Sequence, residues 1–184
     1  MAKKNILIVI DVQNDFITGA LRNEEAIKKL PNIVKLIETD KFDKIYVTMD
    51  THDKNYLNTL EGQKLPVEHC IKNTEGWNMP KVVADALFTN NNMTSIFEKE
   101  TFGSVYMAGN ISATLSNDIA HMKDYEFTIV GFCTDICVVS NALLLRAYLP
   151  NNKITVLRDC TAGVTPETHE AALKTMEMCQ IDVI

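Results

Sequence analysis

The chain alternates short apolar runs with longer segments in which apolar residues recur every three or four positions. The apolar runs predict strands at residues 5–10, 44–49, 93–97, 126–130, 153–157 and 181–184. The longer segments predict helices at residues 24–39, 112–122, 135–149 and 166–179. Because this alternation is typical of right-handed crossovers, we predict a three-layer αβα protein with a central, mostly parallel sheet and a Rossmann-like topology.

The first apolar run indicates how the sheet is covered. Residues 6–10 are all apolar, as expected for a central parallel strand with helices on both faces. A chain of 184 residues with 46% apolar composition fits one domain spanning residues 1–184. Residues 50–80 form the longest stretch without a predicted element, and loops of that length in compact domains are often functional.

Charge and cysteine content narrow the function classes. A net charge of −6 argues against a nucleic-acid partner. The apolar run at residues 6–10 is too short for a signal peptide, and no run reaches the length of a membrane span. The five cysteines are odd in number and scattered, which fits a reducing compartment. We therefore expect a soluble, cytoplasmic protein.

Reactive residue types follow four of the predicted strands. In doubly wound sheets, ligands bind beyond the carboxyl ends of the strands. These ends carry Asp11, the pair Asp50 and His52, Lys99 and Cys137. A single aspartate at a strand end is more often a cap, and a single lysine is more often solvated. Their joint position on one rim predicts an active site.

Cys137 lies between an apolar strand and a helix. A thiol near a helix N-terminus experiences the helix dipole, so we expect Cys137 to be held partly as a thiolate and to act as a nucleophile. Taken alone, a cysteine in an apolar run is more often a small buried residue.

The segment after the second predicted strand offers ligands for a metal ion. Asp50 and His52 alternate along the chain, and His69 returns later. One carboxylate and two imidazoles suit a catalytic divalent ion such as zinc, iron or manganese. Glu61 lies between the two halves and is a candidate fourth ligand, directly or through water. Two ordinary loop histidines are the alternative.

Three segments together resemble a known family. They are Asp-Val-Gln-Asn-Asp-Phe at residues 11–16, Phe-Glu-Lys at residues 97–99, and Gly-Phe-Cys-Thr-Asp-Ile-Cys-Val at residues 131–138. In this order they are similar to the signature segments of the isochorismatase-like cysteine hydrolases, the superfamily that includes nicotinamidase/pyrazinamidase. The resemblance spans nearly the whole chain and implies a six-stranded, mostly parallel sheet between helices.

The resemblance also implies roles for individual residues. Asp11, Lys99 and Cys137 would form the catalytic triad, and the backbone N–H groups of Cys133 and Cys137 would bind the oxyanion. A cis peptide is expected between Phe132 and Cys133. Nicotinamidase-type members have an Asp-x-His metal site with a downstream histidine, which matches Asp50, His52 and His69, and zinc is the first expectation. Members usually form homo-oligomers, so a dimer or tetramer is expected.

These expectations define a substrate class. The leading prediction is an amidohydrolase that converts nicotinamide, or a similar small carboxamide, to the acid and ammonia through a thioester. Phe16 would form one wall for the pyridine ring, with Trp77 or Tyr56 as a second wall. The aromatic residue that often precedes the second metal histidine is missing from residues 64–69.

Other functions remain open at the level of sequence. One alternative is a C–N hydrolase acting on a carbamoyl or ureido compound. Another is an isochorismatase-like vinyl-ether hydrolase. A catalytically silent binding or scaffold member is the non-enzyme alternative.

Overall fold

The protein is built on one parallel sheet. The computed structural model describes residues 3–39, 41–89 and 93–184. Its six strands are arranged in the order β3-β2-β1-β4-β5-β6, and all neighbouring strands are parallel. The strands are β1 (Lys4–Ile10), β2 (Lys44–Asp50), β3 (Met93–Lys99), β4 (Tyr125–Phe132), β5 (Lys153–Ala162) and β6 (Asp182–Val183). The predicted α/β class and all six predicted strands are confirmed.

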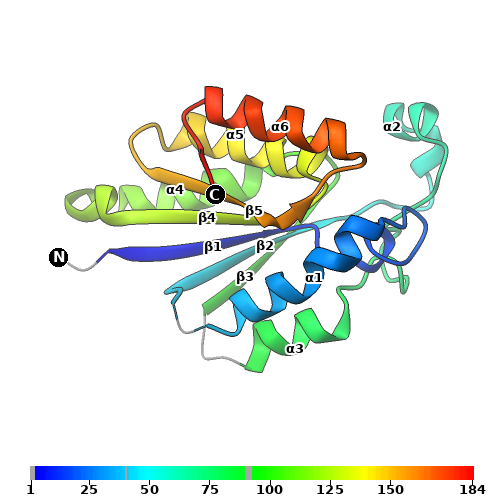
Figure 1. The fold of residues 1–184 in the computed structure, drawn as a ribbon, viewed down its shortest axis with the longest axis horizontal. Coiled ribbons are helices and arrows are strands. Elements are labelled where there is room, and N and C mark those ends of the chain that lie inside the picture. Colours follow the sequence, from blue (N-terminus) through cyan, green and yellow to red (C-terminus); the bar gives the residue numbers. More distant parts are fainter. Residues whose placement is uncertain (1–2, 40, 90–92) are drawn as a thin grey trace.

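Helices cover both faces of the sheet (Figure 1). One face carries α1 (Glu24–Ile37) and α3 (Lys81–Thr89), and the other carries α4 (Val105–Ser116), α5 (Val139–Tyr148) and α6 (Pro166–Met178). The short helix α2 (Leu60–Lys64) lies away from both layers, beyond the end of the sheet. Within the described ranges, no helix is long and apolar enough to cross a bilayer.

The central strand β1 connects the two halves of the core. Ile6, Ile8 and Ile10 pack into the cluster on the side of α4 to α6, while Leu7 and Val9 pack into the cluster on the opposite face. Both faces are buried, which explains the unbroken apolar run in the sequence.

The strand order reverses at β1: β2 and β3 lie on one side of it, and β4, β5 and β6 lie on the other. The chain runs outward through β2 and β3 and then returns to place β4 on the other side of β1. The carboxyl ends of β1 and β4 therefore mark the topological switch point, where doubly wound sheets bind ligands. Gly131 permits the close approach there: its φ is +124°, and a Cβ would lie 2.0 Å from the Ile10 carbonyl oxygen.

Three helical assignments differ from the sequence prediction, and one of them is the short helix α2, which was not predicted. The predicted helix at residues 112–122 is wrong in its limits, because α4 already begins after Ser104, whose side chain accepts a hydrogen bond from Met107 N. It is followed by a separate 3-10 segment, Ile119–Asp124. Helix α3 was not predicted, although Pro80 precedes it and buried residues recur at Val83, Ala86 and Leu87.

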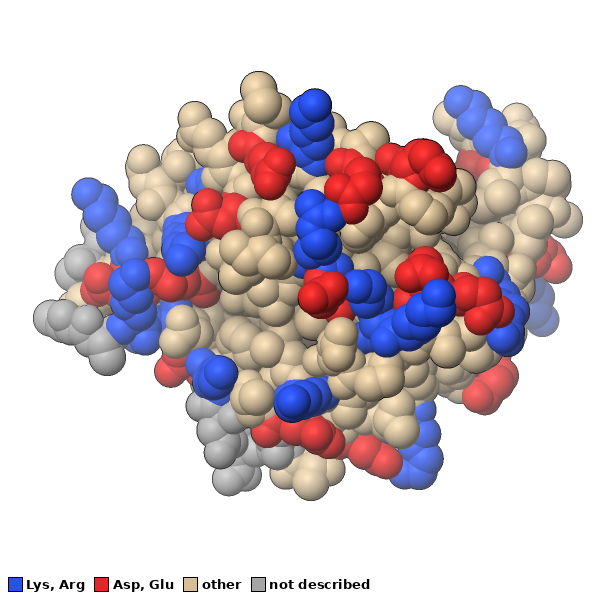
Figure 2. Space-filling view, in the orientation of Figure 1, with Lys and Arg blue, Asp and Glu red and all other residues tan. Residues whose placement is uncertain are grey.

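Charged side chains are mixed on the visible surface (Figure 2). Lys and Arg alternate with Asp and Glu over the face that the figure shows, so the described residues of that face form no continuous basic surface. This distribution agrees with a net charge of −6.

Candidate active site

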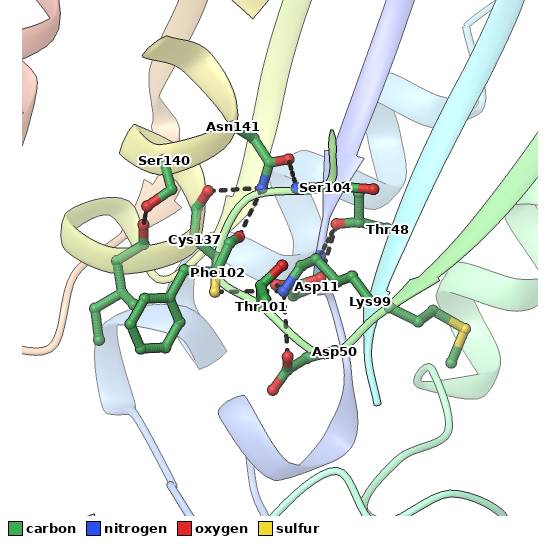
Figure 3. A network of polar contacts seen from close by, with 12 residues as sticks. Asp11, Thr48, Asp50, Lys99, Thr101, Phe102, Ser104, Cys137, Ser140 and Asn141 are labelled. Carbon is green, nitrogen blue, oxygen red and sulfur yellow. Dashed lines mark hydrogen bonds and ion pairs between the residues drawn. The ribbon is translucent and has the colours of Figure 1, made fainter. Parts of the chain in front are cut away.

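Asp11, Lys99 and Cys137 converge beyond the carboxyl ends of three strands (Figure 3). Asp11 directly follows β1, Lys99 ends β3, and Cys137 lies in the turn between β4 and α5. The Lys99 ammonium forms an ion pair of 2.6 Å with Asp11 Oδ2 and lies 3.6 Å from Cys137 Sγ. All three residues are buried. The structure therefore brings together the three side chains that the sequence predicts on one rim of the sheet.

Asp11 is held in place by the neighbouring strand β2. Thr48 Oγ1 donates a 2.7 Å hydrogen bond to Asp11 Oδ1, and Asp11 N donates one of 3.1 Å to the Thr48 carbonyl. Asp11 has a φ of +48°, a left-handed conformation that aspartate tolerates better than most residues. The sequence analysis missed Thr48. Thr48 lies in register with Ile10, the residue before Asp11, and this pairing becomes visible only in the sheet.

Cys137 lies in a π-helical turn, Thr134–Val138. Val138 N donates to the Cys133 carbonyl over 3.0 Å, which closes the wider turn, and such π-turns occur frequently at functional sites. The peptide between Phe132 and Cys133 is cis, as the family resemblance implied. Because helical structure begins here, the first N–H groups have no partner earlier in the helix.

Asp11, Lys99 and Cys137 shift one another's pKa values. Burial raises the pKa of Asp11 and outweighs the opposing charge of Lys99. Burial would lower the pKa of Lys99, but the charges of Asp11, Cys137 and Asp50 hold it above its usual value. The resting site therefore contains a firmly protonated lysine beside a carboxylate with enhanced basicity.

The surroundings of Cys137 shift the thiol pKa in the direction opposite to the sequence expectation. Burial, followed by the charge of Asp11, raises the pKa of the Cys137 thiol well above its usual value, although Lys99 opposes this shift. This direction disfavours the partly ionised thiol that the sequence predicts, because desolvation and the adjacent carboxylate both favour the neutral form. Cys137 must instead lose its proton to a base when it reacts.

Asp50, His52 and His69 form a second buried cluster beside the first. Asp50 Oδ2 lies 3.0 Å from His52 Nε2 and 3.5 Å from His69 Nε2, and the three ligand atoms lie within 4.8 Å of one another. Ligands bound tetrahedrally at zinc distances lie about 3.4 Å apart. The spacing and the donor types fit a divalent metal ion, so the three residues form a candidate metal site.

Glu61 completes this cluster from α2. Its Oε1 atom lies 3.7 Å from Nε2 of both His52 and His69. Burial, and then the charge of Asp50, raises the pKa of Glu61. Glu61 is therefore a candidate fourth donor, and it lies on helix α2, which the sequence pattern does not predict.

Lys99 connects the two clusters. Its ammonium lies 3.2 Å from Asp50 Oδ1, so the same cation contacts the triad carboxylate and the metal-site carboxylate. Burial alone would raise the pKa of Asp50, but hydrogen bonds from His52 and His69 and the charge of Lys99 hold it well below its usual range. Asp50 is therefore ionised and ready to bind a cation.

Two further polar residues position the metal site, and both follow β1. Gln13 bonds the backbone of Asp50 twice, accepting from its N–H over 2.7 Å and donating to its carbonyl over 2.8 Å. Asp15 Oδ2 accepts a 2.7 Å hydrogen bond from Cys70 N, next to His69. The sequence analysis assigned them no role, although both lie in the first signature segment.

A cavity of about 640 Å³ opens onto both clusters. Phe16 lines it and meets the His69 ring edge-on, with centroids 5.7 Å apart. Tyr56 also lines it and packs against the His52 and His69 rings at 4.7 and 5.0 Å. Trp77 lies outside the lining and anchors a loop by donating from Nε1 to Thr51 Oγ1 over 2.8 Å. Of the two alternatives for a second aromatic wall, the geometry favours Tyr56.

The fold and the buried acid, ammonium and thiol together define a hydrolase-type α/β enzyme. The model of the isochorismatase domain family matches residues 5–184, and the chain belongs to this family. The predicted resemblance is thereby confirmed.

Similar proteins point to one branch of the family. The chain is 27% identical to a nicotinamidase of Schizosaccharomyces pombe, over 97% of this chain and 91% of the relative. It is 26% identical to the nicotinamidase/pyrazinamidase of Mycobacterium tuberculosis, over 97% of both proteins. The crystal structure of the Bacillus subtilis nicotinamidase/pyrazinamidase superposes with a TM-score of 0.80 at 26% identity, covering 98% of both chains. These relatives agree with the prediction of a hydrolase for non-peptide C–N bonds.

The coupling of Asp11 and Cys137 is testable by thiol labelling. We expect Asp11→Asn to shift the pH profile of iodoacetamide labelling at Cys137 to lower pH by about one unit or more. The variant removes a negative charge that raises the thiol pKa and leaves Lys99 to stabilise the thiolate. Mass spectrometry of the labelled peptide measures the profile, and Cys179 is an internal control. A shift to higher pH would contradict this account of the site.

Proposed function

We propose that the protein is a cysteine-dependent, metal-containing amidohydrolase that converts nicotinamide, or a closely similar small carboxamide, to the carboxylic acid and ammonia. One observation carries the proposal: the Lys99 ammonium lies within contact distance of the Asp11 carboxylate and of the Cys137 thiol, and Cys137 lines an open cavity. The names of the similar proteins support the choice of substrate.

The first half of the reaction forms a thioester. Asp11 accepts the thiol proton while Cys137 Sγ attacks the carboxamide carbon, and Lys99 stabilises the negative charge that passes between them. Backbone N–H groups of Cys133 and Cys137 donate to the oxygen of the tetrahedral intermediate. When the C–N bond breaks, Asp11 returns its proton to the nitrogen, and ammonia leaves.

The second half regenerates the enzyme. Asp11 accepts a proton from a water molecule that attacks the thioester carbon. Collapse of this second intermediate breaks the C–S bond and releases the carboxylic acid, and the thiolate recovers its proton from Asp11. The raised pKa of Asp11 suits this exchange, because the group must both accept and release a proton near neutral pH.

Asp50, His52 and His69 would hold the divalent ion, with Glu61 as a fourth ligand and zinc as the first choice. When bound, such an ion supplies a Lewis-acid position for the ring nitrogen of a pyridine carboxamide. Phe16 borders the same space and would restrict the orientation of the ring. We further expect a dimer or tetramer, in line with the family resemblance.

Turnover of nicotinamide tests the proposed reaction. Purified protein should release ammonia and nicotinate at about 1–100 per second, in the ordinary range for enzymes. Cys137→Ala should lower kcat at least about 10⁴-fold, because it removes the nucleophile. Cys179→Ala, which changes a partly exposed thiol at the end of α6, is the matched control and should keep full activity.

The turnover measurements also distinguish the proposed function from the alternative functions. Turnover of only a ureido or carbamoyl compound would reject nicotinamide as the substrate while retaining a C–N hydrolase. A plant relative, from Arabidopsis thaliana, is described as a probable inactive nicotinamidase at 28% identity. If the wild type and Cys137→Ala were equally inert on every carboxamide, the silent binding role would replace the enzyme.

Metal content tests the candidate ligands directly. We expect about one divalent ion per chain in the wild type, measured by mass spectrometry of the metal. His52→Ala should lose this ion and nearly all nicotinamide turnover. Only Asp50 and His69, with the more distant Glu61, would remain to bind the ion, and they would bind it far less tightly. His121→Ala removes a histidine paired with Asp118 and should retain both. Full nicotinamide turnover by a metal-free wild type would contradict the metal assignment. A wild type with neither bound metal nor nicotinamide turnover would favour the vinyl-ether alternative.

A further inference from the structure

Asn141 in α5 is a fully buried amide with every polar atom engaged (Figure 3). Its Nδ2 group donates to the Cys137 carbonyl over 2.8 Å and to the Phe102 carbonyl over 3.0 Å. Its Oδ1 atom accepts a 2.8 Å hydrogen bond from Ser104 N. A buried side chain with three backbone partners fixes the relative position of the segments that it bonds.

These partners belong to two segments that carry reacting groups. The Cys137 carbonyl is part of the nucleophile turn. Phe102 and Ser104 lie in the loop that leaves β3 directly after Lys99, where Ser104 also caps α4. Asn141 therefore links the chain around the thiol to the chain around the ammonium.

The sheet alone does not set the distance between these two segments. Lys99 ends β3, and the nucleophile turn follows β4, yet β2 and β1 lie between those strands. Three strand spacings amount to about 14 Å. The contact of 3.6 Å between Lys99 Nζ and Cys137 Sγ thus depends on how the connections fold over the end of the sheet. Asn141 bonds both of these connections at once.

We propose that Asn141 is a positioning residue that holds the nucleophile turn and the Lys99 loop in register, so that the ammonium and the thiol meet. The inference rests on the proposed function for its kinetic consequence. Asn141 itself touches neither the substrate space nor the metal ligands: it is absent from the cavity lining, and its recorded bonds are to backbone atoms.

A matched pair of asparagines makes the test sharp. Asn152 is also buried, and its Nδ2 group donates to the carbonyls of Met122 and Tyr125 over 2.7 and 3.0 Å. Met122 precedes β4 and Tyr125 is its first residue, so Asn152 lies at the amino ends of the strands, away from the site. Leucine or alanine at position 141 or 152 removes the same kind of buried hydrogen bonds, and both changes should lower stability.

Only the changes at position 141 should alter catalysis. We expect Asn141→Leu and Asn141→Ala to lower kcat for nicotinamide by about 10- to 100-fold, the scale of a misplacement of about 1 Å. KM and metal content should change less than about threefold. Asn152→Leu and Asn152→Ala should retain wild-type kcat at a temperature where all variants are folded. If both substitutions at position 141 prevent folding, Asn141→Asp and Asn152→Asp replace them, because aspartate keeps the size and the acceptor for Ser104 N.

Equal kcat values in the Asn141 variants and the Asn152 variants would overturn the positioning role of Asn141. A fall in kcat that is matched by the Asn152 variants would do the same, because it would reflect general destabilisation. If the wild type does not hydrolyse carboxamides, the proposed function fails, and thiol labelling then decides the inference by itself. The pH midpoint for iodoacetamide at Cys137 should rise in Asn141→Leu, where Lys99 is farther away, and stay unchanged in Asn152→Leu.

Discussion

One buried cation holds this site together. Lys99 is almost inaccessible to solvent, and its ammonium contacts Asp11, Asp50 and the sulfur of Cys137. Two buried carboxylates would repel each other and bear a large desolvation cost without a compensating charge. The lysine offsets this cost and joins the catalytic cluster to the candidate metal site. Removing its charge would disturb both halves, even though they lie on different strands.

The parallel sheet explains why such an arrangement forms at this place. Every strand points its carboxyl end to the same rim, and the reversal of strand order between β1 and β4 opens that rim at its centre. Gly131 allows these two strands to approach closely just before their chains diverge. The loops that leave the strands can then fold over the opening. Side chains such as Gln13 and Asn141 bond them to one another through backbone groups.

The sequence predicts features that depend on local pattern or on position at a strand end. Short, largely apolar runs identify the strands, and their ends place Asp11, Asp50, Lys99 and Cys137 on one rim. Features that depend on tertiary surroundings are not accessible in this way. Burial and Asp11 raise the pKa of Cys137, whereas the position of the thiol near a helix N-terminus in the sequence favours a partial thiolate. Thr48 is likewise an unremarkable strand residue until the sheet brings it to Asp11.

The same distinction applies to the long segment after β2. Its histidines have recognisable spacing, so the candidate metal site is predictable. Helix α2 is only a single short turn, too short to produce a periodic signal, yet it brings Glu61 to the two imidazoles. Asn141 gives no signal either, because an asparagine in a predicted helix is normally a surface residue. Its importance emerges only from the three backbone groups around it.

The most direct test of this account is the nicotinamide turnover number of Lys99→Met, measured on protein whose folded state is verified by circular dichroism. Methionine has a similar length and removes only the charge and the donors. The account predicts that kcat falls by at least about 10³-fold, because the thiol and the two carboxylates lose their shared counter-charge. A folded Lys99→Met protein that retains kcat within tenfold of the wild type would contradict it.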